Sequence, residues 1–242
     1  MKLRWKHFLD LLAASLVPLL TITLINHYAS RRLGKTISGR AQNTLTDAVK
    51  QEMVRATRSY AAFSILERTT TEFALGWLAA ETELALALAP PSPTRIYYAA
   101  DFDDPSSAPE DMALSTNHPI SSEGGAGTYR SISRKHPSFL LAPGTIKEEV
   151  ASDIARFTRL SSTLRSMNQR YGEGLIWAYV SLENGVHISY PGHGGYPAGY
   201  DPRERPWYMM AKKSKAPVWF PVVDATTGQL ILTLSMPFKR PD

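Results

Sequence analysis

The sequence predicts an α+β fold in which a transmembrane helix and a long helix precede an antiparallel sheet flanked by helices. Three patterns lead to this prediction: an uncharged apolar run near the N-terminus, a proline-free stretch with apolar residues at helical spacing, and two strand–turn–strand patterns in the last third. The 242 residues are enough for one large or two small domains, and a hydrophobic content of 43% indicates a folded chain.

The uncharged run extends from Leu11 to Ile25. A helix that crosses a bilayer needs about 20 mostly apolar residues, which the wider range from Phe8 to Tyr28 supplies. We therefore predict a cytoplasmic tip and a transmembrane anchor over residues 1–30. A cleaved signal peptide is the alternative, but His27 and Tyr28 stand where small residues should precede a cleavage site.

Charge and cysteine content exclude several classes of partner and site. The formal net charge is +5, and the first forty residues hold seven of the 27 basic residues but only one of the 22 acidic residues. These basic residues flank the apolar run on both sides, so charge alone does not set its orientation in a membrane. The rest of the chain is nearly neutral, which argues against nucleic acid as a partner. Because there is no cysteine, disulfides and thiolate metal sites are excluded.

A long stalk helix is predicted over residues 31–89, directly after the anchor. The stretch has no proline, and at ~1.5 Å per residue it would be on the order of 80 Å long. Two shorter helices that meet near Gly39 or Gly76 are the alternative. The helix should end before three prolines, Pro90, Pro91 and Pro93. Its apolar stripe consists of Ile37, Ala41, Leu45, Val49, Met53, Ala56, Tyr60, Phe63, Leu66, Phe73, Trp77, Ala80 and Leu84.

Residues 90–242 are predicted to form the sheet domain. An Asn-Gly turn and a Thr-Gly turn each join two strands, which gives an antiparallel sheet with helices on one side. The chain ends directly after a strand, so we expect this domain to be incomplete at its C-terminus. The predicted elements are a strand at 95–102, a polar loop at 103–144 with GGAG at 124–127, a helix at 147–171, and strands at 175–182, 186–190, 218–224 and 229–238.

Residue patterns for metal or catalytic sites are weak. His187 and His193 have no other ligand at the close spacing of a metal site, which normally needs three or four converging ligands. The chain has no Gly-x-Ser-x-Gly elbow, phosphate loop or dinucleotide fingerprint. We therefore expect no metal, no cofactor and no enzyme activity in this chain.

The segment GYDPRERPWYMMA, residues 199–211, indicates ligand binding instead. The guanidinium of Arg205 can bind a carboxylate through two parallel hydrogen bonds, and the tyrosines at 200 and 208 can donate single ones. Trp207 would form a wall that excludes water. Asp224, at the end of a later strand, could bind an ammonium group, so the five residues together suit a small zwitterion such as an amino acid.

A purely structural role for the same segment is the alternative. Pro202, Pro206 and Trp207 would then only lock a turn against the sheet. In that case the guanidinium of Arg205 would pair with Asp201 or Glu204, and no group would be left for a ligand.

The chain from about residue 30 onward resembles the membrane-distal half of a double Cache domain, a PAS-like extracytoplasmic sensor of bacterial chemoreceptors, sensor kinases, cyclases and phosphatases. The resemblance is most specific over 190–238, in YDPRERPWY and WFPVVDATTGQLILTLSMPF. In family members that bind amino acids, a Tyr, an Arg five residues later, a Trp and a Tyr hold the ligand. Tyr200, Arg205, Trp207 and Tyr208 match these positions.

The match to the family's amine-binding residues is incomplete. The family has a Tyr-x-Asp motif in the next strand and a more distant Asp. Asp224 matches the first aspartate, Val222 stands where the tyrosine belongs, and the distant aspartate would fall beyond residue 242. The stretch PGHGGYPAGYDPRERPWY is also similar to input regions fused to PPM-type serine phosphatases.

The resemblance implies a sensor input region in the bacterial inner membrane, single-pass in this stretch, with residues from about 30 onward periplasmic or extracellular. It would bind a small carboxylate-bearing ligand such as an amino acid or organic acid, form a homodimer through the stalk helix, and pass the signal through the stalk and membrane helices. A C-terminal output domain could be a kinase, cyclase or phosphatase. The alternatives are a membrane-anchored enzyme built from Arg205, Asp224 and His193, or a ligand-free module for structure or dimerisation.

Overall fold

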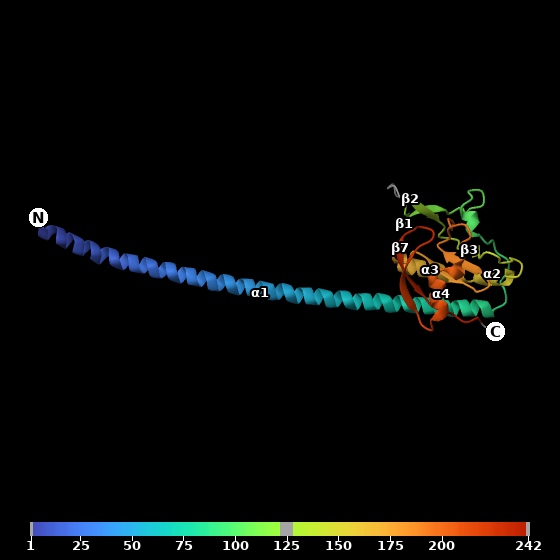
Figure 1. The fold of residues 1–242 in the computed structure, drawn as a ribbon, viewed down its shortest axis with the longest axis horizontal. Coiled ribbons are helices and arrows are strands. Elements are labelled where there is room, and N and C mark those ends of the chain that lie inside the picture. Colours follow the sequence, from blue (N-terminus) through green and yellow to red (C-terminus); the bar gives the residue numbers. More distant parts are fainter. Residues whose placement is uncertain (1, 122–127, 241–242) are drawn as a thin grey trace. The chain divides into compact units, whose positions relative to one another are not determined.

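The computed structural model describes residues 2–121 and 128–240, and it has the predicted α+β class. Its first element is one continuous helix, α1 (Lys2–Ala87), which passes through both glycines at which a break was the alternative. The chain divides into two compact units, Met1–Leu66 and Glu67–Asp242. The last six turns or so of α1, from Glu67 to Ala87, thus belong to the second unit, which holds the remaining elements (Figure 1).

The predicted transmembrane anchor at residues 1–30 needs correction. Within the described residues, no helix is both long enough and apolar enough to cross a membrane. The uncharged run Leu11–Ile25 has only 15 residues and contains Pro18, whereas a spanning helix needs about 20 mostly apolar residues. This finding overturns the anchor and the inner-membrane location that we predicted from it.

The core of the second unit lies under a three-stranded antiparallel sheet of order β3-β5-β4 (Ser138–Leu141, Val186–Tyr190, Ala178–Ser181). Two helices, α2 (Ala151–Phe157) and α3 (Leu160–Tyr171), pack against it together with the end of α1. Phe157 and Leu164 are fully buried here, as are Val186 and Ile188 of the central strand. Every residue of β5 is buried, which makes this strand the centre of the unit.

Two separate hairpins complete the second unit. β1 (Ala113–Ile120) pairs with β2 (Thr128–Ile132), and β6 (Val218–Val223) pairs with β7 (Leu230–Ser235). The short helix α4 (Pro206–Lys213) packs on β6 and β7. The remaining elements are 3-10 turns, η1 (Ala99–Phe102), η2 (Gly172–Gly174) and η3 (Pro202–Glu204).

Three predicted elements differ from the structure. The expected strand at 95–102 is mostly irregular and ends in η1, because the Asp101 carboxylate accepts a hydrogen bond from the Tyr98 main chain and turns the backbone. The expected loop at 103–144 contains β1, β2 and β3, while its GGAG segment at 124–127 lies outside the described residues. The expected helix at 147–171 is divided into α2 and α3.

Candidate ligand-binding site

The segment 199–211 contains the 3-10 turn η3 and most of the helix α4. Asp201 caps η3 by accepting a hydrogen bond from the main-chain N–H of Arg203 at 2.8 Å. Arg205 then has extended backbone angles and caps α4, whose first residue is Pro206. Proline suits this position, because its ring fixes a helical φ and it lacks an N–H that would have no partner there. The sequence therefore holds the Arg205 side chain at the start of α4.

Arg205 does not make the ion pairs that a purely structural turn would require. The Asp201 carboxylate is bound by Arg203, with an Nη2–Oδ2 distance of 2.7 Å. Within the described residues, the Arg205 guanidinium has no ion pair and no hydrogen bond. The Cζ atom of Arg205 lies 5.3 Å from the centre of the Tyr200 ring. This cation–π contact stabilises the positive charge and leaves the N–H groups of the guanidinium unused. The two-pronged donor of Arg205 thus remains free.

Tyr200 is the second predicted residue, and it belongs to a layer of stacked rings. Its ring lies 4.9 Å from that of Tyr196, which in turn stacks on His193 at 4.9 Å. Burial raises the pKa of Tyr200 to about 12, while the charge of Arg205 lowers it and that of Asp224 raises it. The hydroxyl therefore stays protonated and able to donate at neutral pH, and both charged groups are near enough to act on it.

Asp224 follows β6 and holds the turn to β7. Its Oδ2 accepts three hydrogen bonds: from the Thr226 hydroxyl at 2.8 Å, and from the Thr227 N–H and hydroxyl at 2.8 and 2.6 Å. From the described residues, Oδ1 accepts none. One oxygen of Asp224 therefore shapes the turn, and the other is available to a cationic group. Val222, two residues earlier, is half-buried in β6 and offers no hydroxyl.

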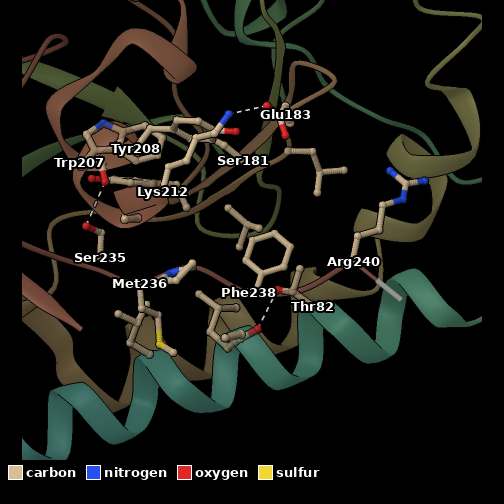
Figure 2. Close-up of a pocket in the computed structure, with 18 of the residues that line it drawn as sticks. Thr82, Ser181, Glu183, Trp207, Tyr208, Lys212, Ser235, Met236, Phe238 and Arg240 are labelled. Carbon is tan, nitrogen blue, oxygen red and sulfur yellow. Dashed lines mark hydrogen bonds and ion pairs between the residues drawn. The ribbon is translucent and has the colours of Figure 1, made fainter. Parts of the chain in front are cut away.

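Trp207 and Tyr208 lie on α4 and line a cavity of about 680 Å³. Figure 2 shows both side chains on one side of this cavity and Phe238 on the side of α1. Trp207 is buried, and its ring lies 4.6 Å from that of Tyr179. Tyr200, Arg205 and Asp224 are not among the residues that line the cavity. Of the five predicted residues, two thus face the cavity and three lie beside the stacked rings.

Sequence reasoning missed most of the ring layer. The ring of Trp177 contacts those of His118 and His193 in tilted arrangements, with ring centres 4.2 and 4.0 Å apart. Burial lowers the pKa of His193 to about 4, so its imidazole is neutral. Both of its ring nitrogens have partners in the chain, among them the Tyr196 hydroxyl at 3.1 Å. An enzyme that used His193 as a base would need to break these contacts, and the aromatic residues of PGHGGYP were the signal that could have revealed the layer.

Residues that could hold a metal ion do not come together in the described part of the chain, where no group of three or more His, Asp or Glu side chains has the required arrangement. His187 is instead bonded through Nδ1 to the Ser181 hydroxyl at 2.6 Å. Burial lowers the pKa of His187 to about 3. It therefore serves as a neutral core residue.

Comparison with known proteins gives three partial matches, and no family model matches the chain. The methyl-accepting chemotaxis protein McpB of Bacillus subtilis is 30% identical over 95 residues. PscA of Pseudomonas syringae pv. tomato is 36% identical over 70 residues, and McpA of Pseudomonas putida is 30% identical over 96 residues; both have the same description. The matches cover 38%, 28% and 39% of this chain but only 12%, 11% and 15% of the respective relatives.

Proposed function

We propose that this chain is the ligand-sensing input region of a bacterial signal-transduction protein, with a PAS-like fold of the double Cache type. All three relatives are described as methyl-accepting chemotaxis proteins, which supports a signalling role. The ligand is a small molecule with a carboxylate, and an amino acid is the first candidate. The chain itself carries out no reaction on it.

The observation that carries this proposal is the free guanidinium of Arg205. It is half-buried, lies over the Tyr200 ring at 5.3 Å, and has no carboxylate partner within the described residues, because Arg203 takes Asp201. An arginine fork of this kind is suited to bind a ligand carboxylate through two hydrogen bonds. Oδ1 of Asp224 is available for a ligand ammonium group, and the charges of Asp224 and Arg205 both act on the Tyr200 hydroxyl, which supports an amino acid as the ligand.

A path from this site to α1 starts at the β6–β7 hairpin. Trp219 in β6 donates its ring N–H to the Glu72 carboxylate of α1 at 2.7 Å. A ligand that binds one arrangement of the hairpin more tightly than another would shift the position of this part of α1. The ligand's differential affinity therefore supplies the free energy of the signal.

A second copy of the chain is the proposed partner of α1. In the first unit, large apolar side chains on this helix are exposed, among them Leu45, Met53 and Tyr60. With Val49, which is also exposed, they are spaced by four, four and seven residues, which is the pattern of a helix–helix interface. We infer a homodimer through α1, and sedimentation of the full chain with and without Leu45→Lys and Met53→Lys tests it.

A thermal-shift screen with amino acids and organic acids tests the ligand. A ligand at about 100 times its dissociation constant should stabilise the protein by roughly 2.7 kcal/mol. Arg205→Ala should abolish this shift, and Arg205→Lys should reduce it, because lysine keeps the charge but loses the fork. Lys213→Ala is the control: it removes an exposed positive charge from the other end of α4, leaves the Arg203–Asp201 pair in place and should retain the shift. An equal shift in Arg205→Ala, or no shift with any compound, contradicts the proposal.

A further inference from the structure

The cavity of Figure 2 lies between two strand edges. β4 is the last strand of the β3-β5-β4 sheet, and β7 is the last strand of the β6-β7 sheet. Consecutive residues line the cavity at the C-terminal end of each strand, from Tyr179 to the residue after β4, Leu182, and from Leu234 to the residue after β7, Met236. A strand that turned one face to the cavity would contribute alternate residues. Consecutive residues therefore indicate that both strands present their edges, and we call the space between them the strand slot.

The edge of β4 carries main-chain groups that point into the strand slot. The N–H of Leu182 donates to the carbonyl of Val186 in β5 at 2.8 Å. In an antiparallel pair, residues alternate between those bonded to the partner strand and those that point away from it. Tyr179 and Ser181 are thus the β4 residues whose main-chain N–H and C=O point away from β5. Within the described residues, these main-chain groups have no hydrogen-bond partner.

The edge of β7 has the same property. The N–H of Asp224 donates to the carbonyl of Gln229 at 2.8 Å, which fixes the alternation in the second hairpin. Leu230, Leu232 and Leu234 are therefore the residues whose main-chain groups point away from β6, and of these Leu234 lines the strand slot. The opposite edge of this hairpin differs, since Pro221 of β6 lies there, is exposed, and has no N–H to offer. Of the two strands of this hairpin, β7 is thus the one whose outward-facing residues all have a main-chain N–H to offer a further strand.

Side-chain polar groups around the strand slot are mostly engaged already, so they do not explain it as a site for a polar small molecule. The Thr82 hydroxyl donates to the Leu78 carbonyl at 2.7 Å, and the Ser235 hydroxyl to the Trp207 carbonyl at 3.0 Å. Arg240 binds the Asp153 carboxylate at 2.8 and 3.0 Å. Lys212 pairs with Glu183, as Figure 2 shows. Within the described residues, the groups left without partners are the main-chain groups of the two strand edges and the hydroxyl of Tyr208.

We propose that the strand slot accepts one extended polypeptide strand from outside the described residues, which pairs with β4 and β7 and joins the two sheets into one. The strand would span four to six residues, the lengths of β4 and β7. Its faces would meet α1 at Leu75 and Leu78, and α4 at Trp207 and Ala211. Both surroundings are apolar, so the strand should be a continuous apolar run, as in sheets covered on both faces.

A second copy of the chain is not the expected donor of this strand. Each described strand is already paired within its own sheet, so a copy would have to open a hairpin or the central sheet to release one. The segment after β7 does not fill the slot either. It runs along α1, where the Lys239 N–H donates to Glu83 at 2.8 Å. The inference is independent of the ligand proposed above, because it rests on main-chain groups alone.

A tethered strand tests the proposal without knowledge of the natural donor. A flexible Gly/Ser linker and the strand Ile-Val-Leu-Val-Ile-Val would follow Asp242 in the full chain; a short linker gives a millimolar effective concentration. Hydrogen–deuterium exchange at the amides of Tyr179, Ser181 and Leu234 should slow by at least about tenfold in the monomeric fraction. The matched control has proline at every second position of the added strand and should leave exchange unchanged.

A substitution in β7 gives the second arm. Leu234→Pro removes an N–H that points into the slot, as Pro221 does naturally on the other edge, and should abolish the slowing at Tyr179 and Ser181. Leu234→Ala loses the side chain but keeps the N–H, so it should retain the effect. Slow exchange at Thr233, whose N–H pairs with β6, confirms that the hairpin is intact.

Three results would overturn the proposal. The first is exchange at the slot amides that does not change with the tethered strand. The second is equal slowing with the proline-containing strand, which would make the slot a site for apolar groups rather than for a strand. The third is slowing confined to a dimeric fraction, which would make a second copy the occupant.

Discussion

Asp224 is expected to have two separable roles, and two substitutions distinguish them. Asp224→Ala removes the acceptor of three hydrogen bonds from Thr226 and Thr227, two residues that are 5% and 2% exposed. Each buried donor left without a partner costs about 1–3 kcal/mol. Hydroxyls can rotate toward other acceptors, which places the total near the lower end, at about 3 kcal/mol.

Asp224→Asn should cost much less, because an amide oxygen can accept the same three bonds. Bonds to a charged acceptor are roughly twice as strong as neutral ones, so we expect a loss of about 1 kcal/mol. In a domain of about 150–250 residues, 1 kcal/mol changes Tm by roughly 2–4 °C. The alanine variant should therefore melt roughly 6–12 °C below the wild type and the asparagine variant roughly 2–4 °C below it, measured by calorimetry.

The ligand arm uses isothermal titration of the Asp224→Asn variant. Without a negative charge opposite the ligand ammonium, amino-acid affinity should fall by at least about tenfold, or about 1.4 kcal/mol. A ligand with a carboxylate but no amine should bind with unchanged affinity, since it depends on Arg205. Equal destabilisation by the two substitutions would refute the turn argument. Unchanged amino-acid affinity in Asp224→Asn would refute the role in amine binding.

Two further predictions concern protonation. Burial lowers the pKa of His193 to about 4 and that of His187 to about 3, below the ordinary value of 6.5. Between these values the unfolded chain binds protons that the folded chain does not, so the free energy of unfolding should fall as the pH drops from about 6.5 toward 4, by up to ~1.4 kcal/mol per pH unit for each histidine. His193→Gln should reduce this pH dependence in denaturant titrations. An unchanged pH dependence would contradict the prediction. Hydrogen bonds from Arg68 and then Trp219 lower the pKa of Glu72, so Trp219→Phe should raise that pKa in an NMR titration, whereas Val223→Ala on the same strand should not.

The fold elements that local chemistry decides could be predicted from the sequence. The two hairpin turns are correct because Gly185 and Gly228 adopt positive φ, at 93° and 71°, which glycine accepts most easily. β3 was missed because its partner, β5, lies more than forty residues away, and a four-residue strand that follows Pro137 and ends two residues before Pro143 has no periodic signal of its own. The turn at Tyr98 was missed because one carboxylate, that of Asp101, outweighs the β propensity of its aromatic neighbours.

In the candidate site, too, local features could be predicted from the sequence and contacts between distant residues could not. The residue types at 205, 207 and 208 indicated binding, and α4 begins where Pro206 indicates it should. The sequence could not show that Arg203 rather than Arg205 binds Asp201, since the two arginines stand two and four residues from the same carboxylate. Nor could it show the strand slot, which exists only because two hairpins distant in sequence end side by side.

Trp207 connects the strand slot, which it lines, with the start of α4, where Arg205 lies. The Trp207 ring contacts that of Tyr179 in β4, and its carbonyl accepts a hydrogen bond from the hydroxyl of Ser235 in β7. The helix α4 therefore contacts both strands that border the strand slot. A change in the distance between β4 and β7 would therefore tilt α4, the helix that Arg205 caps. A selection for variants with a changed ligand preference should therefore recover substitutions in β4 and β7, at residues that do not contact the ligand.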